Sequence, residues 1–93
     1  MTVRWTPRAA DDLEAIYDYI AKDKPAAASK MIQSIVQTVD LLEDNPEIGP
    51  LDNDGRTRRL VVRPYIVAYQ VHAHSVQVLA VIHSARRWPG DFD

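Results

Sequence analysis

The sequence contains no cysteine, and it contains no lysine after Lys30. Without cysteine there can be no disulfide framework and no thiolate metal site, and this absence is typical of proteins in a reducing compartment, so we expect a cytoplasmic location. Long hydrophobic runs are also missing: no uncharged apolar stretch approaches the ~20 residues of a membrane span. The first twelve residues lack the apolar core of a signal peptide. We therefore expect no signal peptide and no membrane partner.

Of the 93 residues, 46% are hydrophobic. This apolar content is enough for a single domain over residues 1–93 with its own core. The formal net charge of −2 is unevenly distributed. Residues 1–55 carry five basic and eleven acidic side chains, whereas residues 56–93 carry six basic side chains, all arginine, and two acidic ones. This asymmetry indicates a surface that meets an anion or an acidic partner. The alternative is that the arginines only protect exposed sheet edges.

In the first half of the chain, apolar residues recur at helical spacing in two separate segments. A capping residue and a proline at Thr6-Pro7 precede an apolar stripe that includes Tyr17, which predicts a helix from about residue 7 to about residue 22. A second stripe follows Pro25, and Asn45-Pro46 cannot continue a helix, so the second helix is expected from about residue 25 to about residue 44. The short connection predicts an antiparallel helical hairpin.

The rest of the chain alternates between apolar and polar residues, as strands do. A short strand is expected at 2–5, and after a loop at 45–55 three more are expected at 58–62, 65–72 and 76–83. The order β-α-α-β-β-β predicts an α+β domain in which the hairpin packs on one face of a mainly antiparallel four-stranded sheet. The predicted contacts between helices and sheet are Leu13, Ile16, Ile32, Ile35 and Val39 against Leu60, Val67, Leu79 and Val81.

Five segments, in order along nearly the whole chain, resemble the RelE/ParE family of bacterial type II toxins; they are Trp5-Thr6-Pro7, "AADDLEAIYDYIA", "NPEIGP", "RRLVVRPYIVAYQV" and "VLAVIHSARRWP". The resemblance implies a toxin that a cognate antitoxin neutralises by wrapping it with an extended, helix-containing tail. The family has two branches. RelE-like members cut mRNA in the ribosomal A site, and ParE-like members inhibit DNA gyrase without being nucleases.

The sequence contains the types of residue that a metal-free nuclease site would need. Cleavage of RNA needs a proton-transfer group and cations that stabilise the phosphorane, and the candidates for these roles are His83, Arg86 and Arg59. The alternative is structural: a lone histidine at a strand end more often hydrogen-bonds a neighbour. Arg58 and Arg59 are adjacent, so they should point to opposite faces of the strand. The three histidines lack metal-ligand spacing, and we expect neither a metal nor another cofactor.

Three features favour the ParE-like branch and DNA gyrase as the target: the absence of late lysines, the absence of a tyrosine near the C-terminus, and the ending "VIHSARRW". The alternative partner is the ribosome with its mRNA, and a third hypothesis is a non-toxic interaction domain. Direct sequence-specific binding of DNA is not expected. Trp88 is expected to cover the end of the core. The residues expected to bind target or antitoxin are Arg58, Arg59, Arg63, Tyr65, Arg86, Arg87 and Trp88.

Overall fold

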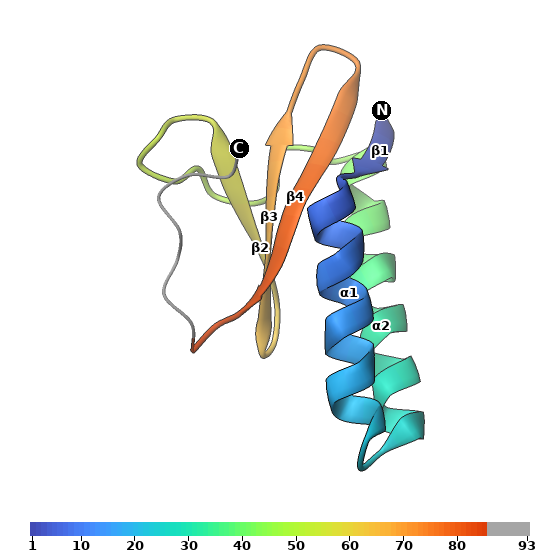
Figure 1. Ribbon diagram of the computed structural model, residues 1–93. Coiled ribbons are helices and arrows are strands. Elements are labelled where there is room, and N and C mark those ends of the chain that lie inside the picture. Colours follow the sequence, from blue (N-terminus) through green and yellow to red (C-terminus); the bar gives the residue numbers. More distant parts are fainter. Residues whose placement is uncertain (86–93) are drawn as a thin grey trace.

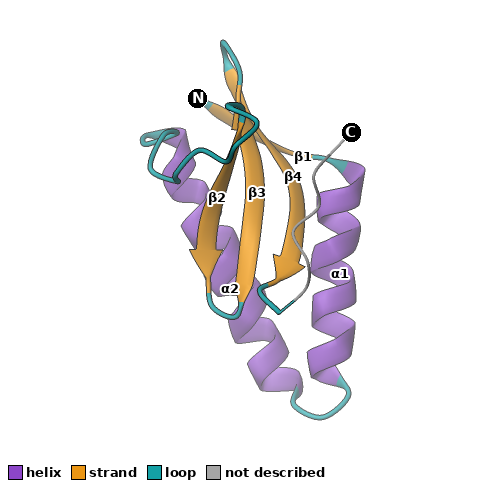
Figure 2. Cartoon of the chain, turned by 90° about the vertical axis from the view of Figure 1, so that its left-hand side faces the viewer, coloured by secondary structure: helices purple, strands orange, loops and turns teal. Residues whose placement is uncertain are grey.

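The computed structural model describes residues 1–85 and has the predicted order of elements. A short strand leads into two long helices, which form an antiparallel hairpin on one side of the sheet (Figures 1 and 2). Three further strands complete the sheet and confirm the α+β architecture. The elements are β1 (Thr2–Trp5), α1 (Pro7–Ala21), α2 (Pro25–Asp40), the 3-10 turn η1 (Leu41–Glu43), β2 (Thr57–Val62), β3 (Tyr65–Val71) and β4 (Ser75–His83).

Helix α1 is capped and docked by the same side chain. The Thr6 hydroxyl accepts a hydrogen bond from the backbone N–H of Ala9 at 3.1 Å, and Pro7 occupies the first turn, where no N–H partner is needed. The same hydroxyl donates to the carbonyl of Leu79 in β4 at 3.1 Å. One residue therefore starts the helix and fixes that start against the sheet.

Helix α2 ends earlier than the sequence predicted. The α-helical part stops at Asp40, and residues 41–43 tighten into a 3-10 turn instead of continuing to about residue 44. Such tightening is common in the last turn of a helix. No helix in residues 1–85 is both long enough and apolar enough to cross a bilayer.

The sheet has the strand order β1-β4-β3-β2. The β2–β3 and β3–β4 pairs are antiparallel, while β1 lies parallel to β4 and reaches only from Ser75 to Val78. Arg63 and Pro64 form the turn between β2 and β3, joined by a cis peptide bond. The prediction of a mainly antiparallel sheet is confirmed.

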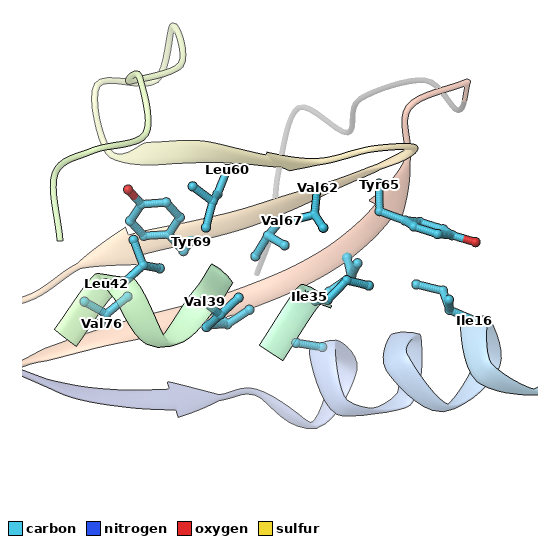
Figure 3. Close-up of a cluster of buried hydrophobic side chains, with 13 residues drawn as sticks. Ile16, Ile35, Val39, Leu42, Leu60, Val62, Tyr65, Val67, Tyr69 and Val76 are labelled. Atoms are coloured by element: carbon cyan, nitrogen blue, oxygen red, sulfur yellow. The ribbon is translucent and has the colours of Figure 1, made fainter. Parts of the chain in front are cut away.

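The main core lies between the helical hairpin and the sheet (Figure 3). Ile35 and Val39 are fully buried there, with Leu60, Val67 and Val81 opposite them, as predicted. The predicted Leu13 and Ile32 are only partly buried against this core.

Two side chains depart from the predicted core. Leu79 belongs to a second, smaller cluster with Ala68, Ala80 and Ile82. The register shifts at this point, because Ala68 pairs with Ala80 but Tyr69 pairs with Val78, so that Leu79 has no partner in β3. Such a bulge changes which side chains face the helices. Tyr17, included in the helical stripe, is 39% exposed, because the buried side of α1 is centred on Ile16 instead.

Candidate partner-binding site

The predicted site residues fall at two ends of the sheet. Arg58 and Arg59 lie near the start of β2, beside the loop of residues 45–55. Arg63, Tyr65 and His83 lie at the opposite end, where β2 turns into β3 and β4 finishes. The other predicted residues, Arg86, Arg87 and Trp88, lie outside the described residues 1–85.

Arg58 holds the loop of residues 45–55 onto the sheet. Its guanidinium donates to the backbone carbonyls of Gly49 at 2.8 Å and Glu47 at 3.2 Å, and it forms an ion pair with the Glu47 carboxylate at 3.4 Å. The N–H of Gly49 in turn donates to the buried hydroxyl of Tyr69 at 2.9 Å. Only 16% of the Arg58 side chain is exposed, so most of it is engaged within the protein.

Gly49 has no room for a side chain. A Cβ there would collide with the backbone oxygen of Arg59 and would stand 2.9 Å from the Tyr69 hydroxyl oxygen. The segment "NPEIGP" is thus explained by packing: a glycine is needed where the loop crosses the sheet. Burial raises the pKa of Tyr69 above its usual value, so the hydroxyl stays protonated near neutrality.

Arg59 points to the other face of the sheet, as predicted. Arg58 stands opposite Tyr69 of the main core, whereas Arg59 stands opposite Ala68 of the second cluster. Arg59 pairs with Asp52 at 3.2 Å. The two adjacent arginines therefore cannot act together on one ligand.

The second end of the sheet borders a groove of about 690 Å³ between α1 and the ends of β3 and β4. Its lining has two parts by chemistry: the apolar residues Ala15, Ile16, Ile20, Met31, Pro64 and Val81, which we call the floor, and the polar and aromatic residues Asp12, Tyr19, Tyr65 and His83, which we call the rim. The mixture of apolar floor and polar rim is typical of a site that binds part of another molecule.

His83 and Tyr65 are cross-strand neighbours on this rim. Their rings are 5.4 Å apart and nearly perpendicular, at 84°. The N–H of Ala85 donates to Nδ1 of His83 at 3.0 Å, and the N–H of Ser84 donates to the carbonyl of Pro64 at 2.8 Å. Burial, with a smaller contribution from nearby Tyr19, raises the pKa of Tyr65. Tyr65 is therefore a neutral hydroxyl near pH 7 and no anionic base.

Two further residues of the rim were not among the predicted site residues. Tyr19, on α1, is 74% exposed, and Asp12 accepts a hydrogen bond from the backbone N–H of Val81 at 2.9 Å. Because β1 pairs with β4 only as far as Val78, the edge of β4 beyond it is unpaired, and the Asp12 carboxylate supplies the missing acceptor. No sequence signal links positions 12 and 81; only the tertiary fold brings them together.

The structure does not bring the nuclease candidates His83 and Arg59 together. Arg59 is aligned across the sheet with Ala68 and Ala80, and His83 lies three residues further along β4. From strand geometry, this is about 10 Å along the strands and about 10 Å across the sheet. His83 also lies on the side of the sheet that faces α1, and Arg59 lies on the other side. Residues 1–85 contain no group of three or more His, Cys, Asp or Glu arranged to hold a metal ion.

Comparison with known sequences identifies relatives over nearly the whole chain. The sequence profile of a family described as "ParE toxin of type II toxin-antitoxin system, parDE" matches residues 3–88. The chain is 38% identical to Toxin RelE2 of Caulobacter vibrioides, over 90% of this chain and 96% of that protein. It is also 38% identical to the protein Y4kP of Sinorhizobium fredii, over 94% of this chain and 92% of that protein.

Solved structures agree with these sequence matches. A chain from the "Chromosomal ParDE TA system from P. aeruginosa" superposes with a TM-score of 0.80 at 31% identity, over 89% of this chain and 95% of that chain. A chain of the toxin–antitoxin complex RelBE2 from Mycobacterium tuberculosis superposes with a TM-score of 0.63 at 24% identity, over 88% and 95% of the two chains. The second likeness is one of fold alone.

Proposed function

Because this chain belongs to the ParE toxin family of type II toxin–antitoxin systems, we propose that it arrests growth by inhibiting DNA gyrase and that a cognate antitoxin neutralises it. The toxin class comes from the family. The choice of target depends on the separation of His83 from Arg59. An acid–base group and a phosphate-stabilising cation must meet at one phosphate for RNA cleavage, and these two lie on opposite faces of the sheet.

The arginines near the loop support the same choice. Arg58 is largely buried and engaged with Glu47 and Gly49, and Arg59 pairs with Asp52. A cation already committed to the protein's own loop is a poor phosphate clamp. Binding to ribosomal RNA also draws much of its affinity from neutralised phosphates, whereas this chain has a net charge of −2.

The second candidate function is cleavage of mRNA on the ribosome. One relative at 38% identity is named Toxin RelE2, which keeps this branch in consideration. In that case His83 would transfer a proton, and Arg86, outside the described residues, would have to supply the cation that Arg59 does not.

We propose the groove and Arg63, at the same end of the sheet, as the surface for the antitoxin tail. The apolar floor fits one side of an amphipathic segment, and Arg63, in the exposed β2–β3 turn, has no ion-pair partner among residues 1–85. Tyr65 lines the groove, whereas Arg59 lies near the start of β2, at the other end of the sheet. Arg86, Arg87 and Trp88 remain predicted contacts.

Two assays with the purified protein test the target. Gyrase supercoiling is measured with increasing toxin, and mRNA ends are mapped on programmed ribosomes. The expected result is loss of supercoiling with intact mRNA; codon-phased cleavage with unimpaired supercoiling would reject gyrase as the target.

A substitution at His83 gives a second test of the target. His83→Gln keeps hydrogen bonding but cannot exchange protons near neutrality. It is expected to change gyrase inhibition by less than about tenfold, whereas loss of a general acid or base costs roughly 10²–10⁴ in rate.

A further inference from the structure

The rim of the groove carries polar groups of two kinds, adaptable and fixed. The hydroxyls of Tyr19 and Tyr65 can each rotate to donate or accept. The Asp12 carboxylate is already engaged, since it accepts from the N–H of Val81 at 2.9 Å and lies 3.8 Å from the Nε of Arg8. His83 is different, because a backbone N–H makes one of its two ring nitrogens, Nδ1, a hydrogen-bond acceptor.

The backbone sets the tautomer of His83. The N–H of Ala85 donates to Nδ1 at 3.0 Å, and a nitrogen that accepts a hydrogen bond carries no proton. In the neutral ring the proton must then be on Nε2. The perpendicular contact with Tyr65 at 5.4 Å fixes the plane of the ring as well. Within residues 1–85, Nε2 has no hydrogen-bond partner of its own.

We infer that His83 is a specificity-determining hydrogen-bond donor in the groove, presenting Nε2–H to an acceptor on the antitoxin segment. This rests on the proposed function, because it takes the antitoxin as the occupant of the groove. The partner segment that fits has a large apolar side chain for the floor of Ile16, Ile20 and Met31. Beside that side chain it carries an oxygen acceptor, a carboxylate, side-chain amide or free backbone carbonyl, that meets His83.

The physical basis of the specificity is the cost of an unpaired donor. A segment with an apolar group at the acceptor position would cover Nε2–H without a hydrogen bond, and leaving a buried polar group unsatisfied weakens binding by about tenfold or more. The apolar floor can accept many side chains of suitable size and discriminates less between them. The histidine therefore rejects wrong partners, and the floor supplies general affinity.

The tautomer is tested directly on the free protein. Long-range nitrogen-15 correlation spectra of the imidazole, recorded where the ring is neutral, distinguish a protonated Nε2 from a protonated Nδ1. We expect a proton on Nε2 alone. A ring protonated on Nδ1, or an equal mixture of the two forms, overturns the inference before any partner is added.

The donor role is tested with two substitutions that place an amide at different positions. The Gln side chain puts its NH2 near the position of Nε2, whereas the shorter Asn side chain puts it near Nδ1. The probe is the product of the open reading frame next to the toxin gene, titrated by calorimetry. We expect His83→Gln to bind within about threefold of wild type and His83→Asn to bind about tenfold more weakly or worse.

The control is His74→Asn, an exposed histidine in the β3–β4 hairpin, which is expected to bind as wild type does. Equal losses in His83→Gln and His83→Asn overturn the donor role but leave antitoxin binding intact. If wild type itself does not bind the probe, the antitoxin part of the proposed function fails, and the partner assignment made here fails with it. Gyrase inhibition is measured in a separate assay, and its outcome affects neither the test of the donor role nor the test of antitoxin binding.

Discussion

Single residues in this protein connect segments that are far apart in the sequence. Thr6 joins α1 to β4, Asp12 joins α1 to the same strand, and Tyr69 joins β3 to the loop at Gly49. Every buried side-chain nitrogen or oxygen among residues 1–85 has a hydrogen-bond partner. These single contacts therefore fix how the elements sit, and their loss should be visible in the free energy of unfolding.

Gly49→Ala should destabilise the protein by about 1–3 kcal/mol, because the added Cβ meets the backbone of Arg59, which cannot move without disturbing β2. Urea denaturation measures the change. The control is Gly55→Asn: Gly55 has φ of +72° with open space around it, and asparagine tolerates that conformation. Equal loss at both glycines would mean that steric contact at Gly49 is not the cause.

Asp12→Ala should lower the free energy of unfolding by about 1–3 kcal/mol, since the N–H of Val81 loses its acceptor at the unpaired edge of β4. Asp12→Asn keeps an oxygen in place and should cost less than about 1 kcal/mol. Comparing the two variants by thermal and urea unfolding separates the hydrogen bond from the charge. A larger loss in the asparagine variant would contradict this role.

At the scale of the element, the start of β2 depends on a turn with an acidic residue. Asp54 accepts hydrogen bonds from the N–H groups of Arg56 and Thr57, at 2.8 Å each, and from the Thr57 hydroxyl at 2.6 Å. The bond from the Thr57 side chain contributes most, and together these bonds lower the pKa of Asp54 from 3.8 to about 2. The ionised carboxylate is what holds the turn.

This turn predicts a pH dependence. Because the pKa is lower in the folded state, the stabilisation is fully present above the unfolded value of 3.8 and is lost as the pH falls toward about 2. Asp54→Asn should therefore flatten the fall in unfolding free energy between these two pH values. Urea titrations at several pH values measure it, and an unchanged slope in the variant would refute the assignment.

The helical hairpin depends on its buried stripe. Ile35 is fully buried between α2 and the sheet, so Ile35→Ala should cost about 2–5 kcal/mol through lost burial and the cavity left behind. Ile32 is only partly buried on the same helix, and Ile32→Ala should cost clearly less. The comparison is made by urea denaturation. Equal costs would indicate that the hairpin packs differently from the structure.

Periodicity was sufficient to predict these elements and most of the apolar core between them, but not the bulge or the single polar contacts that join them. The stripe through Ile35 and the alternation of β3 predict a helix and a strand, because both patterns are local. The bulge at Leu79 was not predictable, since it depends on how β3 and β4 align. The roles of Asp12 and Arg58 were missed for the same reason: an acidic residue near a helix start and an arginine on a strand have ordinary local explanations, and their partners are brought close only by the fold.

At the scale of the whole molecule, the described arginines of the second half of the sequence are divided between the two ends of the sheet: Arg58 and Arg59 lie near the start of β2, and Arg63 follows its end. Arg63 lies in the exposed turn beside the groove, while Arg4 lies on β1, which pairs with the opposite end of β4. Charge at the groove end should steer an acidic antitoxin segment during association.

Arg63→Glu should slow association with the antitoxin by about tenfold at low salt and much less at high salt, because the steering is screened. Arg4→Glu makes the same change in net charge at the far end and serves as the control. Stopped-flow association rates at two salt concentrations measure the effect. If both variants slow association equally, net charge and not the groove end is responsible.

The parallel pairing of β1 with β4 also has a consequence for how the protein is made. Thr2 to Trp5 are synthesised more than seventy residues before their partners, Ser75 to Val78. The helical hairpin can form early from local contacts, whereas the sheet that supports it cannot close until β4 is complete. The groove is bordered by that same strand, so a nascent chain that lacks β4 has no finished groove. The order of synthesis alone therefore leaves the groove incomplete until β4 has been translated.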